Sequence, residues 1–246
     1  MRKQVVIPTY NEAENLPRMT QVLFDLPVED LRLLVIDDGS PDGTGEIADR
    51  LAAEHPEKFQ VIHREGKLGL GTAYLTGFRW ALDHGAGVII QMDADFSHDP
   101  EVIPELISAL EKSDVAIGSR YVEGGALDER WPFWRQGLSA FGNIYARTIL
   151  GMAVKDLTGG YRAWSRETLS AIPLDRVKSE GYAFQVEMIY LAHLLGFEIQ
   201  EVPIYFSERV EGESKMSLTI QAEAALRVWS ILFEYADLRR KARASG

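Results

Sequence analysis

The sequence of 246 residues contains no cysteine. This absence excludes disulfide bonds, thiolate zinc sites and a cysteine nucleophile, and it is typical of proteins in a reducing cytoplasm. The sequence also lacks an uninterrupted apolar run of about 18 residues, the length that a membrane-spanning helix needs. Residues 1–3 lead directly into a strand-like segment, so we expect neither a secretory signal nor a spanning helix.

Positive charge is scarce relative to negative charge. Lysine and arginine total 26 against 37 aspartate and glutamate residues, which gives a net charge of −11. Nucleic-acid-binding proteins present a basic footprint, so we expect no nucleic-acid partner. The composition, 46% hydrophobic and 26% charged, is that of a folded globular protein, and the length fits one large domain, 1–246.

Short runs rich in β-branched residues alternate with helical patterns over the first half of the chain. The predicted strands are 5–7, 33–36, 59–62, 88–92 and 115–118, and the predicted helices are 16–26, 46–53, 72–82 and 103–110. This alternation is typical of βαβ units. Because 33–36 and 88–90 are apolar throughout, both faces of the sheet must be covered. We therefore predict an α/β fold with an open, mostly parallel sheet flanked by helices.

The second half of the chain is more irregular and richer in aromatic residues. The alternation weakens after about residue 122, but we find no linker, repeat or low-complexity tract. We therefore divide the single domain into 1–122, which carries the predicted sheet, and 123–246, an elaboration that ends in a predicted helix over 217–239.

Two segments of this elaboration could meet lipid. Apolar residues recur at helical spacing over 131–152, which begins with Trp131 and Trp134, and predict an amphipathic helix. That helix could cover the core or also touch a bilayer, and both can hold. The basic segment 238–243 could be a solvated helix end or a contact with anionic lipid.

Asp93 and Asp95 follow a predicted buried strand, at the edge of the sheet where ligands of such folds bind. Two carboxylates at positions i and i+2 form half of a site for a hard divalent cation, Mg²⁺ or Mn²⁺, and phosphate oxygens and water can supply the other ligands. Acids at the start of a helix can also serve only as caps. Asp99, followed by Pro100, already provides such a cap, so we favour the metal site.

Asp37 and Asp38 form a second acidic turn after a strand. A carboxylate there can accept hydrogen bonds from a nucleobase or a ribose, but turn formation alone explains the run 37–44 equally well. Glycine spacing excludes two other nucleotide sites. The segment 69–71 lacks the third glycine of a dinucleotide-binding loop, and the Gly-Lys pair at 66–67 is followed by leucine instead of the serine or threonine of a Walker loop.

Several cations stand out in so acidic a chain. Guanidinium groups match phosphate oxygens, although a single arginine more often forms a surface ion pair. The candidates are Arg120, Arg130, Arg135, Arg209 and Lys215. The histidines show no metal or triad spacing and are interpreted as structural or exposed; they are His55, His63, His84, His98 and His193.

Several short segments resemble a known family. The sequences VIPTYNE at 6–12, VIDDGS at 35–40 and MDAD at 92–95 resemble the GT-A fold of family-2 glycosyltransferases. Within that family, four segments resemble dolichol-phosphate mannose synthases and their bacterial polyprenol-phosphate counterparts: 64–74, 93–98, 118–121 and 209–215. The resemblance extends from about residue 5 to residue 215 and therefore covers most of the chain.

This resemblance implies an inverting transfer of mannose from GDP-mannose to a polyprenyl monophosphate. By the same resemblance, the donor nucleotide would be bound by Pro8, Tyr10, Glu12, Ile36 and Asp38. The diphosphate and the divalent cation would be bound by Asp93, Ala94 and Asp95, with Ser97 as a further metal ligand. The donor diphosphate would also be bound by Arg209 and Lys215, and the acceptor phosphate by Arg120 and Arg135. The residues expected to act in catalysis are Asp95, Arg120, Arg209 and Lys215.

Chemistry of this kind needs no strong base. A phosphomonoester with a second pKa near ~6 is largely dianionic at neutral pH and can attack directly. A metal ion and cations stabilise the charge that develops on the departing GDP. The half 1–122 would then bind the nucleotide sugar and the half 123–246 the acceptor.

The resemblance also implies peripheral contact with lipid at the cytoplasmic face of a membrane, alone or through a membrane-anchoring protein. Two alternatives stay open. One is the same fold with another nucleotide sugar, such as UDP-glucose, and the other is a catalytically silent, membrane-associated partner.

Overall fold

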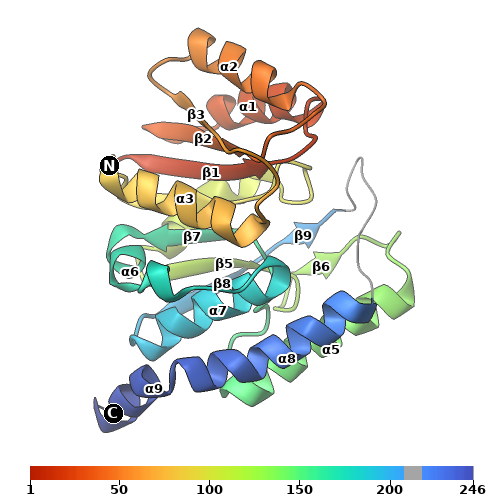
Figure 1. The fold of residues 1–246 in the computed structure, drawn as a ribbon, viewed down its shortest axis with the longest axis vertical. Helices are drawn as coiled ribbons and strands as arrows, with labels where there is room; N and C mark the ends of the chain where they lie inside the picture. The colour runs from red at the N-terminus through yellow and green to blue at the C-terminus, as the bar shows by residue number, and fades with distance from the viewer. Residues whose placement is uncertain (208–217, 246) are drawn as a thin grey trace.

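A seven-stranded sheet forms the centre of the molecule (Figure 1). The computed structural model describes the backbone of residues 1–207 and 218–245, and the side chains of 1–207 and 225–242. The strands of this sheet are β1 Lys3–Thr9, β2 Leu31–Asp37, β3 Phe59–His63, β4 Val88–Gln91, β5 Val115–Ser119, β7 Arg162–Ser165 and β8 Ile199–Pro203. Their order is β3-β2-β1-β4-β7-β5-β8. Only β7 runs antiparallel to its neighbours, which confirms the mostly parallel sheet.

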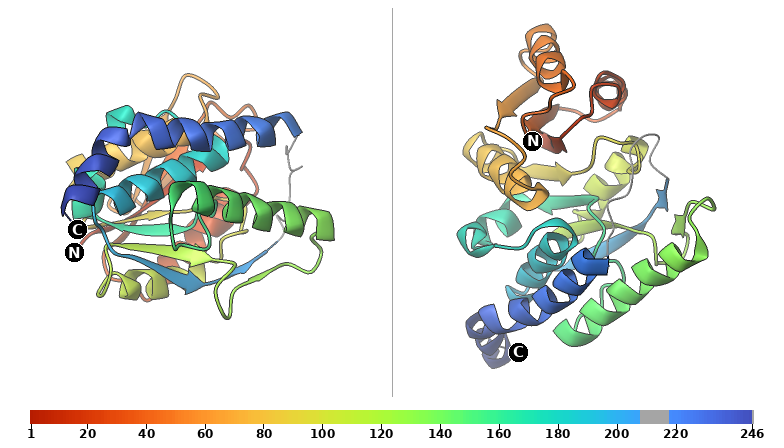
Figure 2. Two further views of the ribbon diagram at one scale, coloured as in Figure 1. Left: turned by 90° about the horizontal axis from the view of Figure 1, so that it is seen from below. Right: turned by 45° about the vertical axis from the view of Figure 1, so that its right-hand side comes forward.

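Helices cover both faces of this sheet (Figure 2). They are α1 Asn15–Asp25, α2 Thr44–Glu54, α3 Leu70–Asp83, α4 Ile103–Ala109, α5 Phe133–Leu150, α6 Arg166–Ala171, α7 Gly181–Leu194, α8 Leu218–Glu234 and α9 Ala236–Ser245, with 3₁₀ turns at Pro100–Val102 and Leu174–Arg176. Val6 of β1 packs into the core beneath α3 and α7, whereas Val5 and Ile7 pack into the core beneath α1 and α4. Successive residues of a strand point to opposite faces, so a sheet covered on both sides needs continuous apolar runs.

The predicted elements of the first half are all present, and the amphipathic helix predicted over 131–152 is α5. The second half contains elements that periodicity did not predict. Among them, α7 is buried on nearly all sides and has no polar stripe, so its sequence shows no amphipathic pattern. A small parallel pair, β6 Ala126–Leu127 and β9 Tyr205–Phe206, stands apart from the main sheet.

The continuous helix predicted over 217–239 is wrong, because the structure has two helices there. α8 ends at Glu234 and α9 begins at Ala236. Arg176 donates a hydrogen bond of 2.9 Å to the carbonyl oxygen of Glu234 and forms an ion pair of 3.0 Å with Asp237. Tyr235 is buried between them, and its hydroxyl donates to Glu187 Oε1 at 2.7 Å. These tertiary contacts hold the break, which local sequence does not signal.

Across the part of the chain that the structure describes, no helix combines the length and the apolar character needed to cross a membrane.

The sheet also determines where polar ligands can bind. The strands β1, β2, β4 and β5 end at the same edge because they run in the same direction. The chain order changes direction between β1 and β4, which creates the crevice where open α/β sheets bind ligands.

Gly77 of α3 lies so close to β1 that an added Cβ would stand 2.3 Å from Val6 Cγ1. Gly77→Ala should lower the free energy of unfolding by roughly 1 kcal/mol or more, since overpacking outweighs the better helix propensity of alanine. Gly142→Ala in α5 is the matched control, because nothing lies within 4 Å of its added Cβ. The control should stabilise by up to about 1 kcal/mol in denaturant unfolding followed by circular dichroism. Equal changes in both variants would contradict the close packing of α3 on β1.

Candidate active site

The acidic turn after β4 is held in one conformation by short hydrogen bonds. Asp95 is buried, and its Oδ1 accepts bonds from the backbone N–H and the hydroxyl of Ser97, at 3.0 and 2.5 Å. The backbone N–H of Asp93 donates to His98 Nδ1 at 3.0 Å. Phe96 has a φ of 58°, a left-handed conformation that is costly for a bulky residue. Strain of this kind concentrates at functional sites, where surrounding contacts maintain it.

Tyr74 of α3 reaches the same turn from beneath. Its buried hydroxyl lies 3.0 Å from both Asp93 Oδ1 and the carbonyl oxygen of Met92. Burial, together with the negative charges of Asp93 and Asp95, holds the pKa of Tyr74 well above its ordinary value. The phenol therefore stays protonated and acts as a donor that orients the turn.

His98 belongs to the acidic turn, a role that its spacing did not predict. The imidazole is buried and stacks on Tyr161, with ring centroids 4.9 Å apart. Because Nδ1 accepts the Asp93 N–H, that nitrogen carries no proton. His98 thus supports the turn from its far end.

The turn after β2 is joined to the end of β1. Asp37 Oδ1 accepts bonds from Thr9 Oγ1 at 3.2 Å and Ser40 Oγ at 2.5 Å. The backbone N–H groups of Asn11 and Glu12 then donate to Ser40 Oγ and to the hydroxyl of Thr44, respectively. The structure therefore brings together, at the ends of two neighbouring strands, the five residues predicted for the nucleotide: Pro8, Tyr10, Glu12, Ile36 and Asp38.

Asp38 is paired with a residue for which no role was predicted. Arg64 Nη1 lies 2.8 Å from Asp38 Oδ1, and both side chains are buried. The backbone N–H groups of Leu68 and Gly69 also donate to this carboxylate. Burial raises the pKa of Asp38, and the positive charge of Arg64 opposes that rise.

Arg120 and Arg135, the two cations predicted to bind the acceptor phosphate, are linked to the acidic turn by contacts that meet at the ring of Phe206. The Arg120 guanidinium carbon lies 5.2 Å from its centroid, and the ring centroids of His98 and Trp131 lie 5.5 and 5.7 Å away. The guanidinium of Arg135 stacks on Trp131 at 3.7 Å. Phe206 belongs to β9, which sequence patterns did not predict, so its position could not be expected.

Arg120 itself forms a buried ion pair of 2.6 Å with Asp156. Arg130, shortly before the start of α5, forms an ion pair of 2.6 Å with Asp128. Ala94 is buried within the acidic turn. Two predicted cations, Arg209 and Lys215, lie outside the described residues.

The acidic turn fits a metal ion that the substrate helps to bind. Asp93 and Asp95 supply hard carboxylate oxygens at the switch point of the sheet, and Asp99, whose Oδ1 accepts the N–H of Glu101, caps the following helical turn instead. Among residues 1–207 and 218–245, no group of three or more His, Cys, Asp or Glu residues is arranged to hold a metal. A cation bound here would therefore need other ligands, such as diphosphate oxygens and water.

Comparison with known proteins gives the family. The model of "Glycosyl transferase family 2" matches residues 4–172. An undecaprenyl-phosphate mannosyltransferase of Micrococcus luteus is 48% identical over 243 residues, which cover 98% of this chain and 99% of that protein. A polyprenol monophosphomannose synthase of Mycolicibacterium smegmatis is 48% identical over 234 residues, which cover 94% of this chain and 87% of that protein.

Solved structures share the fold. Glucosyl-3-phosphoglycerate synthase of Mycobacterium tuberculosis, in complex with Mn²⁺, UDP and its product, aligns with a TM-score of 0.63 at 20% identity, covering 95% of this chain and 79% of that one. The GT-A type of fold is therefore confirmed. Since the family model spans most of the sequence and the two curated relatives match nearly all of it, this chain belongs to glycosyltransferase family 2.

Proposed function

We propose that this protein is an inverting, metal-dependent mannosyltransferase that transfers mannose from GDP-mannose to a polyprenyl monophosphate. The observation that carries the proposal is the 48% sequence identity, over nearly the whole chain, with two enzymes whose names specify mannose and a polyprenyl phosphate. The organised acidic turn supports a working enzyme over a catalytically silent partner, because Asp93, Asp95 and their supporting bonds are all present.

Asp93 and Asp95 would hold the divalent cation, with Ser97 as a further ligand and Ala94 at the diphosphate. When bound, the cation neutralises negative charge that develops on the leaving diphosphate. Tyr74 and Ser97 orient the carboxylates by hydrogen bonds. Arg209 and Lys215 are proposed, from the resemblance alone, to bind the same diphosphate.

The nucleotide would lie across the ends of β1 and β2, in contact with Pro8, Tyr10, Glu12, Ile36 and Asp38. The Asp38 carboxylate is already ion-paired with Arg64 and interacts with the backbone N–H groups of Leu68 and Gly69. A nucleotide that uses Asp38 must therefore share this carboxylate or displace one of these donors. The half 1–122 would accordingly provide the nucleotide site, and the half 123–246 would form the acceptor side together with Arg120, which lies at the boundary between the two halves.

Arg120 and Arg135 would bind the acceptor phosphate. An oxygen of the phosphate dianion attacks the anomeric carbon as the bond to GDP breaks, so the configuration inverts. Because a phosphomonoester with a second pKa near ~6 has already lost its second proton at neutral pH, positioning matters more than a general base.

Helices α5 and α8 carry an apolar surface that would meet the membrane. They lie side by side (Figure 1), and Trp229 Nε1 donates to the Tyr145 hydroxyl at 3.0 Å. Among the described side chains of the two helices, the large apolar ones that are exposed are Phe133, Trp134, Phe141, Ile144, Leu226, Trp229 and Phe233. The opposite face of α5 packs into the core through Ala146 and Leu150, so the helix covers the core, the first of the two roles considered from sequence. Contact with a bilayer, the second role, is part of the present proposal.

We propose that this apolar surface binds peripherally to lipid at the cytoplasmic face, assisted by the basic residues of α9. Apolar burial and attraction between cations and anionic lipid add in such contacts. A membrane-anchoring protein is the alternative occupant of the surface.

Replacing Asp95 with asparagine should reduce metal-dependent turnover by about a hundredfold or more, on the order of 3 kcal/mol of lost transition-state stabilisation. Binding of Mn²⁺ in the presence of GDP, followed by electron paramagnetic resonance, should weaken in parallel. Asp99→Asn is the control, because asparagine can also cap a helix and the turn keeps both of its carboxylates, Asp93 and Asp95. Near-wild-type turnover in the Asp95 variant would remove the metal assignment.

Transfer of radiolabelled sugar to a polyprenyl monophosphate should be fastest from GDP-mannose in a panel that includes UDP-glucose and GDP-glucose. The lipid product should carry mannose in the β configuration if the donor is α-linked, since direct displacement inverts the anomeric carbon. Faster transfer from UDP-glucose would replace the donor assignment.

The double variant Trp134→Ser/Phe141→Ser should bind vesicles that contain phosphatidylglycerol about tenfold or more weakly, because two large apolar side chains no longer enter the interface. Sedimentation with vesicles measures the partition. Leu68→Ser removes an exposed apolar side chain outside α5 and α8 and should not change it. Unaltered binding by the double variant would instead favour a protein anchor.

A further inference from the structure

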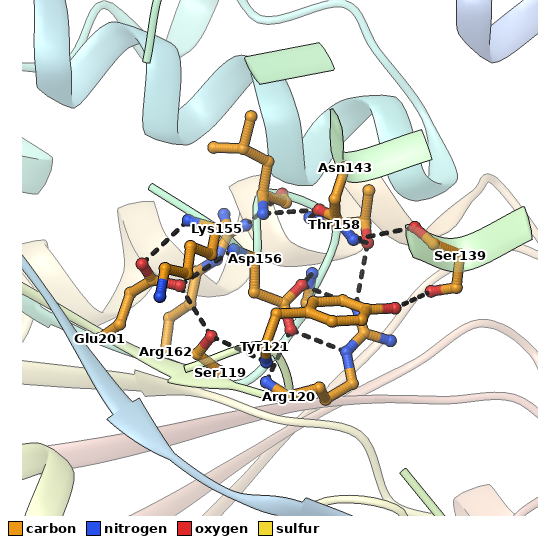
Figure 3. Close-up of polar contacts among 12 residues, drawn as sticks. Ser119, Arg120, Tyr121, Ser139, Asn143, Lys155, Asp156, Thr158, Arg162 and Glu201 are labelled. Atoms are coloured by element: carbon orange, nitrogen blue, oxygen red, sulfur yellow. Dashed lines mark hydrogen bonds and ion pairs between the residues drawn. The ribbon is translucent and has the colours of Figure 1, made fainter. Parts of the chain in front are cut away.

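The hydrogen-bond inventory of Arg120 leaves one nitrogen for an external ligand. Nε donates to Asp156 Oδ2 at 2.7 Å, and Nη2 donates to Asp156 Oδ1 at 2.6 Å and to Thr158 Oγ1 at 2.9 Å (Figure 3). A guanidinium has five N–H donors, and these bonds use three of them. From Nη1, which carries the other two, we find no hydrogen bond to any described residue.

Asp156 is fully buried, and each of its two carboxylate oxygens accepts more than one hydrogen bond. Beyond the guanidinium, its Oδ2 accepts the backbone N–H of Arg120 and its Oδ1 that of Gly159, both at 3.0 Å. Burial by itself would raise the pKa of Asp156, but the charge and hydrogen bonds of Arg120 outweigh it and keep the pKa below its ordinary value. The carboxylate therefore stays ionised and fixes the plane of the guanidinium through a bidentate contact.

Thr158 connects this pair to α5. Its hydroxyl also accepts a bond of 3.1 Å from Asn143 Nδ2, and Asn143 Oδ1 accepts the backbone N–H groups of Leu157 and Thr158 at 2.8 and 3.1 Å. A second link joins the Tyr121 hydroxyl to Ser139 Oγ at 2.7 Å (Figure 3). Two residues of α5 thus contact the segments that carry Arg120 and its partners.

The loop 155–159, which carries Asp156 and Thr158, is also hydrogen-bonded to the sheet. Glu201 of β8 accepts the Ser119 hydroxyl and the Asp156 N–H on Oε1, at 2.7 and 2.9 Å, and the Lys155 N–H on Oε2 at 2.9 Å (Figure 3). Arg120, the loop 155–159 and α5 are consequently held as one unit against the edge of the sheet.

We propose that Asp156, Thr158 and Asn143 are positioning residues that present Arg120 Nη1 to the phosphate of a polyprenyl monophosphate and couple it to α5. This inference rests on the proposed function. Asn143 is buried on the inner face of α5, while Phe141 and Ile144, on the same helix, are exposed. The helix that would meet lipid and the cation that would bind the phosphate are therefore linked by hydrogen bonds through Asn143 and Thr158.

The test is Thr158→Val, which removes the shared acceptor of Arg120 and Asn143 with little change in shape. KM for the polyprenyl phosphate should rise about fivefold or more, whereas KM for the donor and kcat should stay within about twofold, because only acceptor positioning is lost. Thr158→Ser keeps the hydroxyl and should restore the wild-type KM. Thr148→Val, on the exposed face of α5, is the matched control and should have no effect.

Thr158→Ala is measured in parallel and should show the same split, so that a folding defect of the valine variant leaves the inference testable. Calorimetric titration with farnesyl phosphate in the absence of donor provides a readout that does not require transfer. An unchanged acceptor KM and farnesyl phosphate affinity in both variants, or equal losses in the acceptor and donor constants, would overturn the inference while mannose transfer stands. Wild-type binding that weakens in the variants without any mannose transfer would overturn the proposed function alone. A wild type that neither binds farnesyl phosphate nor transfers mannose would overturn both.

Discussion

Burial of the central sheet on both faces leaves only its edges open to polar ligands. Val5, Val6 and Ile7 alternate between two apolar cores, so no polar group of β1 can face a ligand until the strand ends. The same holds for β2, β4 and β5. Because these strands run in one direction, the polar residues that follow their carboxyl ends gather at one edge, which is why Asp38, Asp93 and Arg120 belong to one region.

Each charge that is buried at this edge has a partner that limits its freedom. Asp38 is paired with Arg64, and Arg120 with Asp156. Such pairs add little to stability, because the loss of hydration offsets most of the attraction, but they determine where the remaining donors and acceptors lie. An acidic protein can in this way present localised cations to phosphate groups.

The two halves of the chain meet at Phe206 and along α5. The Phe206 ring lies among His98 from the acidic turn, Arg120 and Trp131, so the acidic turn and the arginine proposed to bind the acceptor share one aromatic contact. Helix α5 has a buried face that contacts the loop of Asp156 and an exposed apolar face. The proposed lipid contact and the residue that contacts the support of Arg120, Asn143, therefore lie on opposite faces of α5.

The local sequence was sufficient for the strands and helices of the first half, for α5 and for the acidic turn, because periodicity and turn residues act over a few neighbouring positions. Motif resemblance supplied the family, which the comparisons confirm. Tertiary structure alone decided the contacts of Tyr74, His98, Asp156 and Phe206, whose partners are supplied by other elements or loops and leave no periodic signal. It also decided the break between α8 and α9, since Arg176, far away in the chain, binds the carbonyl oxygen where the helix stops.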